Sequence, residues 1–79
     1  MSTTATRSLV AELLADIAPE AELDSVADGE DLRQALDLDS MDFLNLVVAL
    51  HERTGVDIPE ADYPRLFTLA GMSEYLGTG

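Results

Sequence analysis

Ser40 is the residue whose type and position in this sequence most strongly suggest a chemical role. It lies in the stretch ALDLDSMDFLNLVVAL, after Asp39 and ahead of a long apolar run. A catalytic serine needs a base within hydrogen-bonding distance and a third group that orients the base. The only histidine, His51, follows eleven residues later, roughly 16 Å away along a helix at about 1.5 Å per residue. We therefore expect no hydrolytic triad and no catalytic residue, with His51 a solvated residue near a helix C-terminus.

Carboxylates are abundant, but their spacing does not indicate a metal site. The segment DSVADGEDLRQA matches the EF-hand calcium loop at Asp24, Asp28 and Gly29. Val26, however, occupies an expected ligand position, and Ala35 stands at the twelfth position, where a bidentate glutamate is needed. The chain has no cysteine, which removes thiolate nucleophiles and Cys-ligated metals. We expect no metal ion.

The charge balance limits the class of partner. The chain has 16 acidic and 4 basic residues, a formal net charge of -12. Nucleic acids and anionic membrane surfaces require a basic patch, which the scattered Arg7, Arg33, Arg53 and Arg65 cannot build. No apolar run approaches the roughly 18 residues of a membrane span, and Glu12 and Asp16 interrupt any signal-peptide core. We expect a cytoplasmic monomer whose partners are basic protein surfaces.

The length of 79 residues, with 47% apolar side chains, is enough for one small domain, expected at residues 1–79. Apolar residues at helical spacing predict an amphipathic helix from about Thr4 to Ala18, which Pro19 ends. The apolar stripe of that helix comprises Leu9, Val10, Leu13, Leu14 and Ile17. Residues 19–38 predict a long ordered loop with one helical turn at Asp31 to Leu36. The loop is expected to be pinned by Leu23, Val26, Leu32, Leu36 and Leu38.

The second predicted helix carries Ser40 and has two apolar faces. It begins at Asp39 or Ser40, both good N-caps, and runs to about Thr54, before Gly55. One face should pack into the core and contains Phe43, Leu46, Val47 and Leu50. A second face, off that stripe, contains Met41, Leu44 and Val48. A bundle this small cannot bury every side of a helix, so we expect the second face to be an exposed docking strip.

Two more helices complete the prediction. Pro59 opens a short third helix, which Tyr63-Pro64 should limit to a turn or so. Thr68 caps a last helix that ends at Gly77. No strand pattern and no repeat is present. The predicted fold class is therefore all-α, a four-helix bundle of three longer helices and one short helix with a long first loop.

Together these features resemble the acyl carrier protein family, the phosphopantetheine-binding carriers of fatty acid, polyketide and related assembly lines. The resemblance covers nearly the whole chain. It is most specific at Asp39-Ser40-Met41-Asp42, and continues through Leu46-Val47-Val48-Ala49-Leu50 and Val56-Asp57-Ile58-Pro59.

The resemblance implies that Ser40, within the motif begun by Asp39, receives 4'-phosphopantetheine from coenzyme A. A separate Mg²⁺-dependent phosphopantetheinyl transferase would attach it, so the chain needs no base of its own. The arm would hold acyl intermediates as thioesters for acyl-loading, condensing or modifying enzymes. The partner-binding residues expected on the helix are Met41, Asp42, Leu44, Asn45 and Val48. The start at Met1 and the end soon after the last helix suggest a discrete carrier.

Two departures from the family pattern qualify the resemblance. Asp37 stands where many members have glycine, three residues before the serine. Past Asp42 the second helix has little acid, whereas carriers of fatty acid synthesis usually have a strongly acidic one. This suggests a specialised pathway whose partners bind the docking strip with less electrostatic attraction to the helix. An aminoacyl or peptidyl cargo, or a carrier-like interaction adaptor without the arm, remain alternatives.

Overall fold

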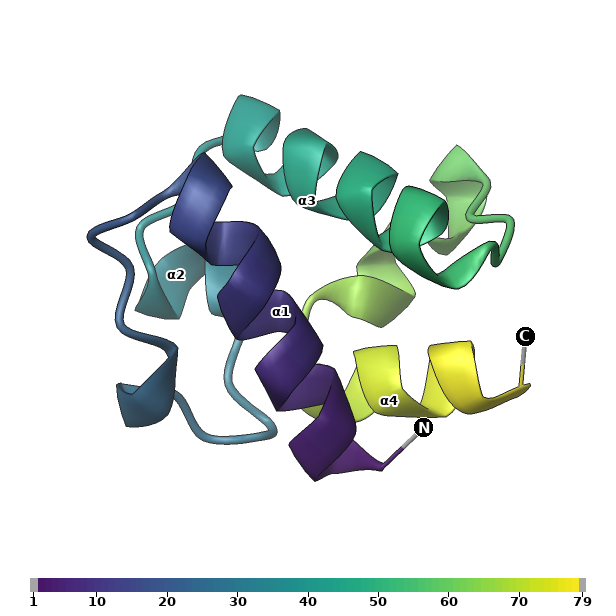
Figure 1. Ribbon diagram of the computed structural model, residues 1–79, viewed down its shortest axis with the longest axis horizontal. Coiled ribbons are helices and arrows are strands. Elements are labelled where there is room, and N and C mark those ends of the chain that lie inside the picture. The colour runs from purple at the N-terminus through teal and green to yellow at the C-terminus, as the bar shows by residue number, and fades with distance from the viewer. Residues whose placement is uncertain (1, 79) are drawn as a thin grey trace.

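The computed structural model describes residues 2–78, and all regular elements in that range are helical (Figure 1). The long helices are α1 (Thr3–Ile17), α3 (Ser40–Thr54) and α4 (Leu69–Thr78). Short elements lie between them: the 3₁₀ turn η1 (Leu23–Ser25), α2 (Leu32–Ala35) and the 3₁₀ helix η2 (Glu60–Leu66). The predicted all-α bundle with three longer helices is confirmed. Residues 1 and 79 of the expected domain lie outside the described residues.

The core lies between the three long helices. α1 crosses the molecule and packs against both α3 and α4, while α4 also packs against η2 (Figure 1). Fully buried side chains come from five of the elements and include Val10, Leu32, Leu46, Leu50, Leu66, Leu69 and Met72. Removal of these side chains from water is the main force that holds the helices together. In the described range no helix is both long and apolar enough to cross a membrane.

Helix α1 follows the predicted pattern with bounds shifted by one residue at each end. It begins at Thr3 because the hydroxyl of Ser2 accepts the N–H of Ala5 at 3.1 Å, an N-cap that the sequence reading missed. The helix ends at Ile17. Thr6 is buried as well, and its hydroxyl donates to the Ser2 carbonyl at 3.0 Å, so the polar group is satisfied inside the core.

The first loop is ordered, as predicted, and Arg7 of α1 helps to hold it. The guanidinium donates to the carbonyl of Leu23 at 2.9 Å and to that of Val26 at 2.8 Å. It also pairs with the Asp28 carboxylate at 2.7 Å. Leu23 and Val26 are buried beneath these bonds. Because loop carbonyls lack helical partners, one arginine that satisfies two of them fixes the loop against α1.

Two predicted helix ends were wrong. Tyr63-Pro64 does not cut the third helix short, because η2 continues to Leu66 with Pro64 inside it. Leu66 is fully buried, and its packing outweighs the one hydrogen bond lost at the proline. Gly77 does not end α4, which runs to Thr78. Glycine in a last helical turn costs only about 1 kcal/mol relative to alanine, so a helix can include it.

Helix α4 begins as predicted, and a glycine lets it approach η2. The hydroxyl of Thr68 accepts the N–H of Gly71 at 3.0 Å. A Cβ atom at Gly71 would collide with the carbonyl oxygen of Arg65, so this position requires glycine for close approach. The junction between η2 and α4 also anchors the first loop through two backbone hydrogen bonds. The carbonyl of Phe67 accepts the N–H of Leu32 at 2.8 Å, and the carbonyl of Asp28 accepts the N–H of Ala70 at 3.0 Å.

Candidate functional site

Asp39, and not Ser40, is the N-cap of α3. Its carboxylate accepts the N–H of Asp42 at 2.8 Å, and its carbonyl accepts the N–H of Phe43 at 3.0 Å. Ser40 is the first residue of the helix. The two residues offered by the sequence as alternative caps therefore have different roles, and the capping function does not require the serine hydroxyl.

Ser40 is exposed, and within residues 2–78 its hydroxyl makes no hydrogen bond. The backbone N–H groups of Ser40 and Met41 likewise have no acceptor among those residues, because the cap satisfies only the N–H of Asp42. Unpaired N–H groups and the positive end of the helix dipole favour an anion here by about 0.3 to 1 kcal/mol at an exposed position. The site thus combines a free hydroxyl with N–H donors that favour an attached phosphate group.

The two apolar faces of α3 are separated as predicted. The inward face is buried and consists of Phe43, Leu46, Val47 and Leu50. On the outward face the exposed fractions are 63% for Met41, 38% for Leu44 and 47% for Val48. These three residues form the apolar strip. Asn45 is also exposed, whereas Asp42 is half-buried near the N-terminus of the helix. The five residues predicted to bind partners therefore lie along one helix that starts at Ser40.

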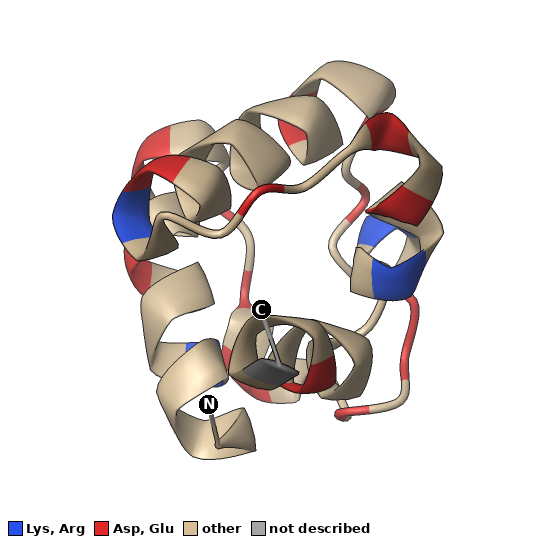
Figure 2. Cartoon of the chain, turned by 90° about the vertical axis from the view of Figure 1, so that its right-hand side faces the viewer, with Lys and Arg blue, Asp and Glu red and all other residues tan. Residues whose placement is uncertain are grey.

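Helix α3 is nearly neutral in an acidic protein. Its acids, Asp42 and Glu52, are accompanied by His51 and Arg53. Figure 2 shows that the acidic positions are distributed over most of the other elements, including the first loop and η2. The excess of negative charge therefore lies mainly outside α3.

Asp37 has a left-handed backbone conformation, with φ at 54°. It follows α2, and the next residue, Leu38, donates its N–H back to the carbonyl of Arg33 at 2.9 Å. This reversal ends α2 and directs the chain into Asp39 and the start of α3. A left-handed residue here explains why glycine suits this position, since glycine has no Cβ to clash.

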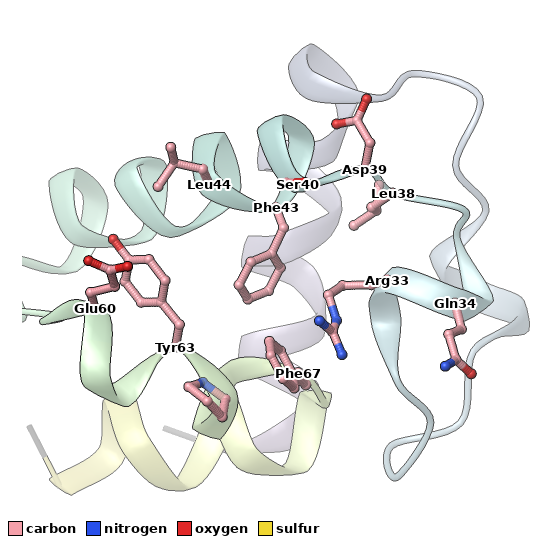
Figure 3. A pocket seen from close by; sticks show the side chains of 11 residues that line it. Arg33, Gln34, Leu38, Asp39, Ser40, Phe43, Leu44, Glu60, Tyr63 and Phe67 are labelled. Carbon is pink, nitrogen blue, oxygen red and sulfur yellow. The ribbon is translucent and has the colours of Figure 1, made fainter.

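A groove of about 890 Å³ opens beside Ser40 between α2, α3 and η2 (Figure 3). Its apolar wall includes a cluster of aromatic rings. The ring of Phe43 meets that of Phe67 edge-on at 5.3 Å and that of Tyr63 at 6.4 Å, measured between centroids. Leu44 of the apolar strip also borders the groove. The sequence reading assigned Phe43 to the core and did not identify a groove, because its other walls come from α2 and η2.

Arg33 forms the cationic side of this groove. Its guanidinium lies 3.5 Å from the centroid of the Phe67 ring and donates to Asp31 at 3.2 Å through Nε and at 2.9 Å through Nη2. The hydrogen bond from Arg33 lowers the pKa of the Asp31 carboxyl below its usual value. Asp31 is also the N-cap of α2, since it accepts the N–H of Arg33 at 2.9 Å. The sequence suggested no role for Arg33 beyond its charge.

His51 lies at the opposite end of α3 from Ser40. It is exposed, and its Nδ1 lies 2.8 Å from the carbonyl oxygen of Val56, which accepts a hydrogen bond from the ring. This confirms the prediction of a solvated histidine near the helix C-terminus. The α-helix between the two residues confirms that His51 is out of reach of the Ser40 hydroxyl.

Comparison with known proteins assigns the site to a family. The curated proteins give no match to the chain. The pattern of the family described as the phosphopantetheine attachment site matches residues 8–76, which include α3 and all residues of the site. Because the match spans most of the sequence, the chain belongs to this family of carrier domains, which bear 4'-phosphopantetheine covalently on a serine.

Proposed function

We propose that this protein is an acyl carrier in which Ser40 bears the 4'-phosphopantetheine arm. The arm would hold acyl intermediates as thioesters for enzymes of a fatty acid, polyketide or related specialised pathway. The observation that carries the proposal is the exposed Ser40 hydroxyl, which has no hydrogen bond within residues 2–78 and stands at the N-terminus of α3. Asp39 supports it by capping the helix without using that hydroxyl.

Loading of the arm requires little from the carrier itself. The Ser40 oxygen would attack the phosphorus of coenzyme A that bears the pantetheine, forming a phosphodiester and releasing adenosine 3',5'-bisphosphate. A base of the transferase would take the hydroxyl proton. The carrier contributes an accessible oxygen and the free N–H groups of Ser40 and Met41, which favour the phosphodiester anion.

The apolar strip is the proposed docking surface for the transferase and the pathway enzymes. Met41, Leu44 and Val48 are exposed on the helix that begins at Ser40, so an enzyme that covers them has the attachment point within reach. Asn45 is exposed on the same helix, and Asp42 lies one turn from the serine. Burial of such apolar side chains in an interface supplies affinity that the weakly charged helix does not.

The remaining properties follow from this role. The chain would act as a monomeric single domain in the cytoplasm and would have no hydrolytic activity, with catalysis left to its partners. The position of His51 supports the lack of hydrolytic activity, since the histidine lies at the far end of α3, out of reach of the Ser40 hydroxyl.

Intact-mass measurement after incubation with coenzyme A and a promiscuous phosphopantetheinyl transferase tests the proposal. We expect a gain of one arm in the wild type and in Ser8→Ala, a control at an exposed serine of α1, and no gain in Ser40→Ala. An unchanged wild-type mass, with a transferase shown to load another carrier, would refute the proposal. Partner binding that persists in Ser40→Ala without any loading would favour the interaction adaptor.

A further inference from the structure

The groove beside Ser40 has a polar side, and that side restricts the acyl groups that it can accept. Resting on the carrier function proposed above, we infer that Arg33 makes this groove selective for acyl groups that carry a neutral oxygen, such as a ketone, over saturated alkyl chains. The volume of about 890 Å³ lies within the roughly 300–1,000 Å³ typical of small-molecule sites. Because Ser40 lines the groove, an acyl group on a flexed arm can enter it.

The apolar wall of the groove suits carbon chains. Phe43 extends from α3 toward Phe67, and Tyr63 stands on the η2 side (Figure 3). Leu38 and Leu44 add aliphatic surface. On their own, these residues would accept any apolar acyl group.

Arg33 changes that chemistry because it reaches from α2 into the space beside these rings (Figure 3). Its position is held by stacking on Phe67 and by the hydrogen bonds to Asp31. A guanidinium has five N–H donors, and Asp31 engages one on Nε and one on Nη2. The other donors have no acceptor within residues 2–78. An alkyl chain packed over them would remove water without replacing its hydrogen bonds, whereas a carbonyl oxygen would accept one.

The charges around the groove disfavour an anionic acyl group. Asp31 already neutralises Arg33. Asp39 and Glu60 also line the groove, and the whole chain has a net charge of -12. A carboxylate on the cargo would therefore meet more negative than positive charge, while a ketone or hydroxyl oxygen would form a hydrogen bond without that repulsion.

The test compares two cargoes of equal length on the full chain. A promiscuous transferase loads octanoyl and 3-oxooctanoyl groups from coenzyme A derivatives in which an amide replaces the thioester, and intact mass confirms loading. ¹H–¹⁵N NMR then follows the Arg33 side-chain Nε–H and the backbone amides of Phe43, Tyr63 and Phe67. We expect the 3-oxo cargo to shift the Arg33 signal, and the octanoyl cargo to leave it near its position in the carrier with an empty arm.

A second measurement uses the true thioesters. Thiol exchange with excess dithiothreitol, relative to the same thioester on free pantetheine, should be about fivefold slower for the 3-oxo cargo than for octanoyl, as one solvent-accessible hydrogen bond would produce. Arg33→Gln should remove this difference. Arg53→Gln is the matched control, since Arg53 pairs with Glu12 on the surface and does not line the groove.

Three results would overturn the inference: equal protection of the two cargoes in the wild type, protection unchanged in Arg33→Gln, or stronger protection of a succinyl cargo, which ends in a carboxylate. The wild-type comparison does not depend on the folding of any variant. Successful loading without these groove signals would refute the selectivity alone, whereas failure to load Ser40 would refute the carrier function.

Discussion

Asp39 caps α3 through its carboxylate, 2.8 Å from the N–H of Asp42, and leaves the hydroxyl of the adjacent Ser40 without a hydrogen bond in the described part of the chain. Both side chains can cap a helix, but only one cap position exists. Because Asp39 occupies the cap position, Ser40 is the next residue, in the exposed first turn of the helix. One of the two adjacent residues therefore stabilises the helix, and the other remains available for modification.

This division predicts different stabilities for two neighbouring alanine variants. Asp39→Ala should lower the free energy of unfolding by about 1 kcal/mol, because the helix loses its cap. Ser40→Ala should change it by less than about 0.5 kcal/mol, because the hydroxyl makes no bond to lose. Urea unfolding followed by circular dichroism measures both. Equal destabilisation by the two substitutions would contradict the assignment of the cap.

The apolar strip predicts variants that fold but interact poorly. Leu44→Glu and Val48→Glu place charge on exposed side chains, so cooperative unfolding should remain close to wild type. If either residue anchors the transferase, its loss costs more than about 1 kcal/mol of binding, or at least about fivefold in kcat/KM for loading. Ala15→Glu, on an exposed position of α1, is the control and should load normally. Loss of cooperative folding in Val48→Glu would instead mean that the residue belongs to the core.

Asp37 predicts a stabilising substitution. Its φ of 54° is unfavourable for a residue with a Cβ, so Asp37→Gly should raise the free energy of unfolding by about 0.5 to 1 kcal/mol after the entropy cost of glycine. Asp37→Asn removes the charge but keeps a side chain that tolerates this conformation, and it separates the two effects. Thermal and urea unfolding should rank Asp37→Gly above both other forms. A gain equal to that of Asp37→Asn would attribute the effect to charge.

Asp31 predicts a pH dependence of stability. The hydrogen bond from Arg33 lowers the pKa of Asp31 in the folded state below its ordinary value of 3.8. The ionised carboxylate therefore adds stability above about pH 4, and this contribution is lost as the pH falls through the lowered pKa. In Arg33→Gln the Asp31 pKa should rise toward its ordinary value, measurable by carboxyl ¹³C NMR. The stability difference between wild type and Arg33→Gln should be largest near neutral pH and should shrink in acid; a constant difference would contradict the coupling.

The sequence predicted α1, α3 and α4 well because each carries a local signal. Helical spacing of apolar residues defines the buried faces, and Gly55, with φ at 73°, ends α3 as expected. The same periodicity separated Phe43 from Val48 on the two faces of α3. The ends of η2 and α4 were predicted less well. Pro64 and Gly77 are local stop signals, and packing of the neighbouring Leu66 and Leu76 in the core overrides them.

The identity and placement of Ser40 were determined by the sequence, since its motif and the following helix are contiguous in the chain. The groove, by contrast, forms only in the tertiary structure. Arg33, Phe43 and Phe67 are separated by ten residues or more along the chain and meet because the first loop docks on the junction of η2 and α4, where Phe67 accepts the N–H of Leu32. Helical periodicity reports which side of one helix faces inward, but it does not report which other element lies opposite. That choice depends on how the helices and the first loop pack together, so the chemistry beside the serine appears only in the folded molecule.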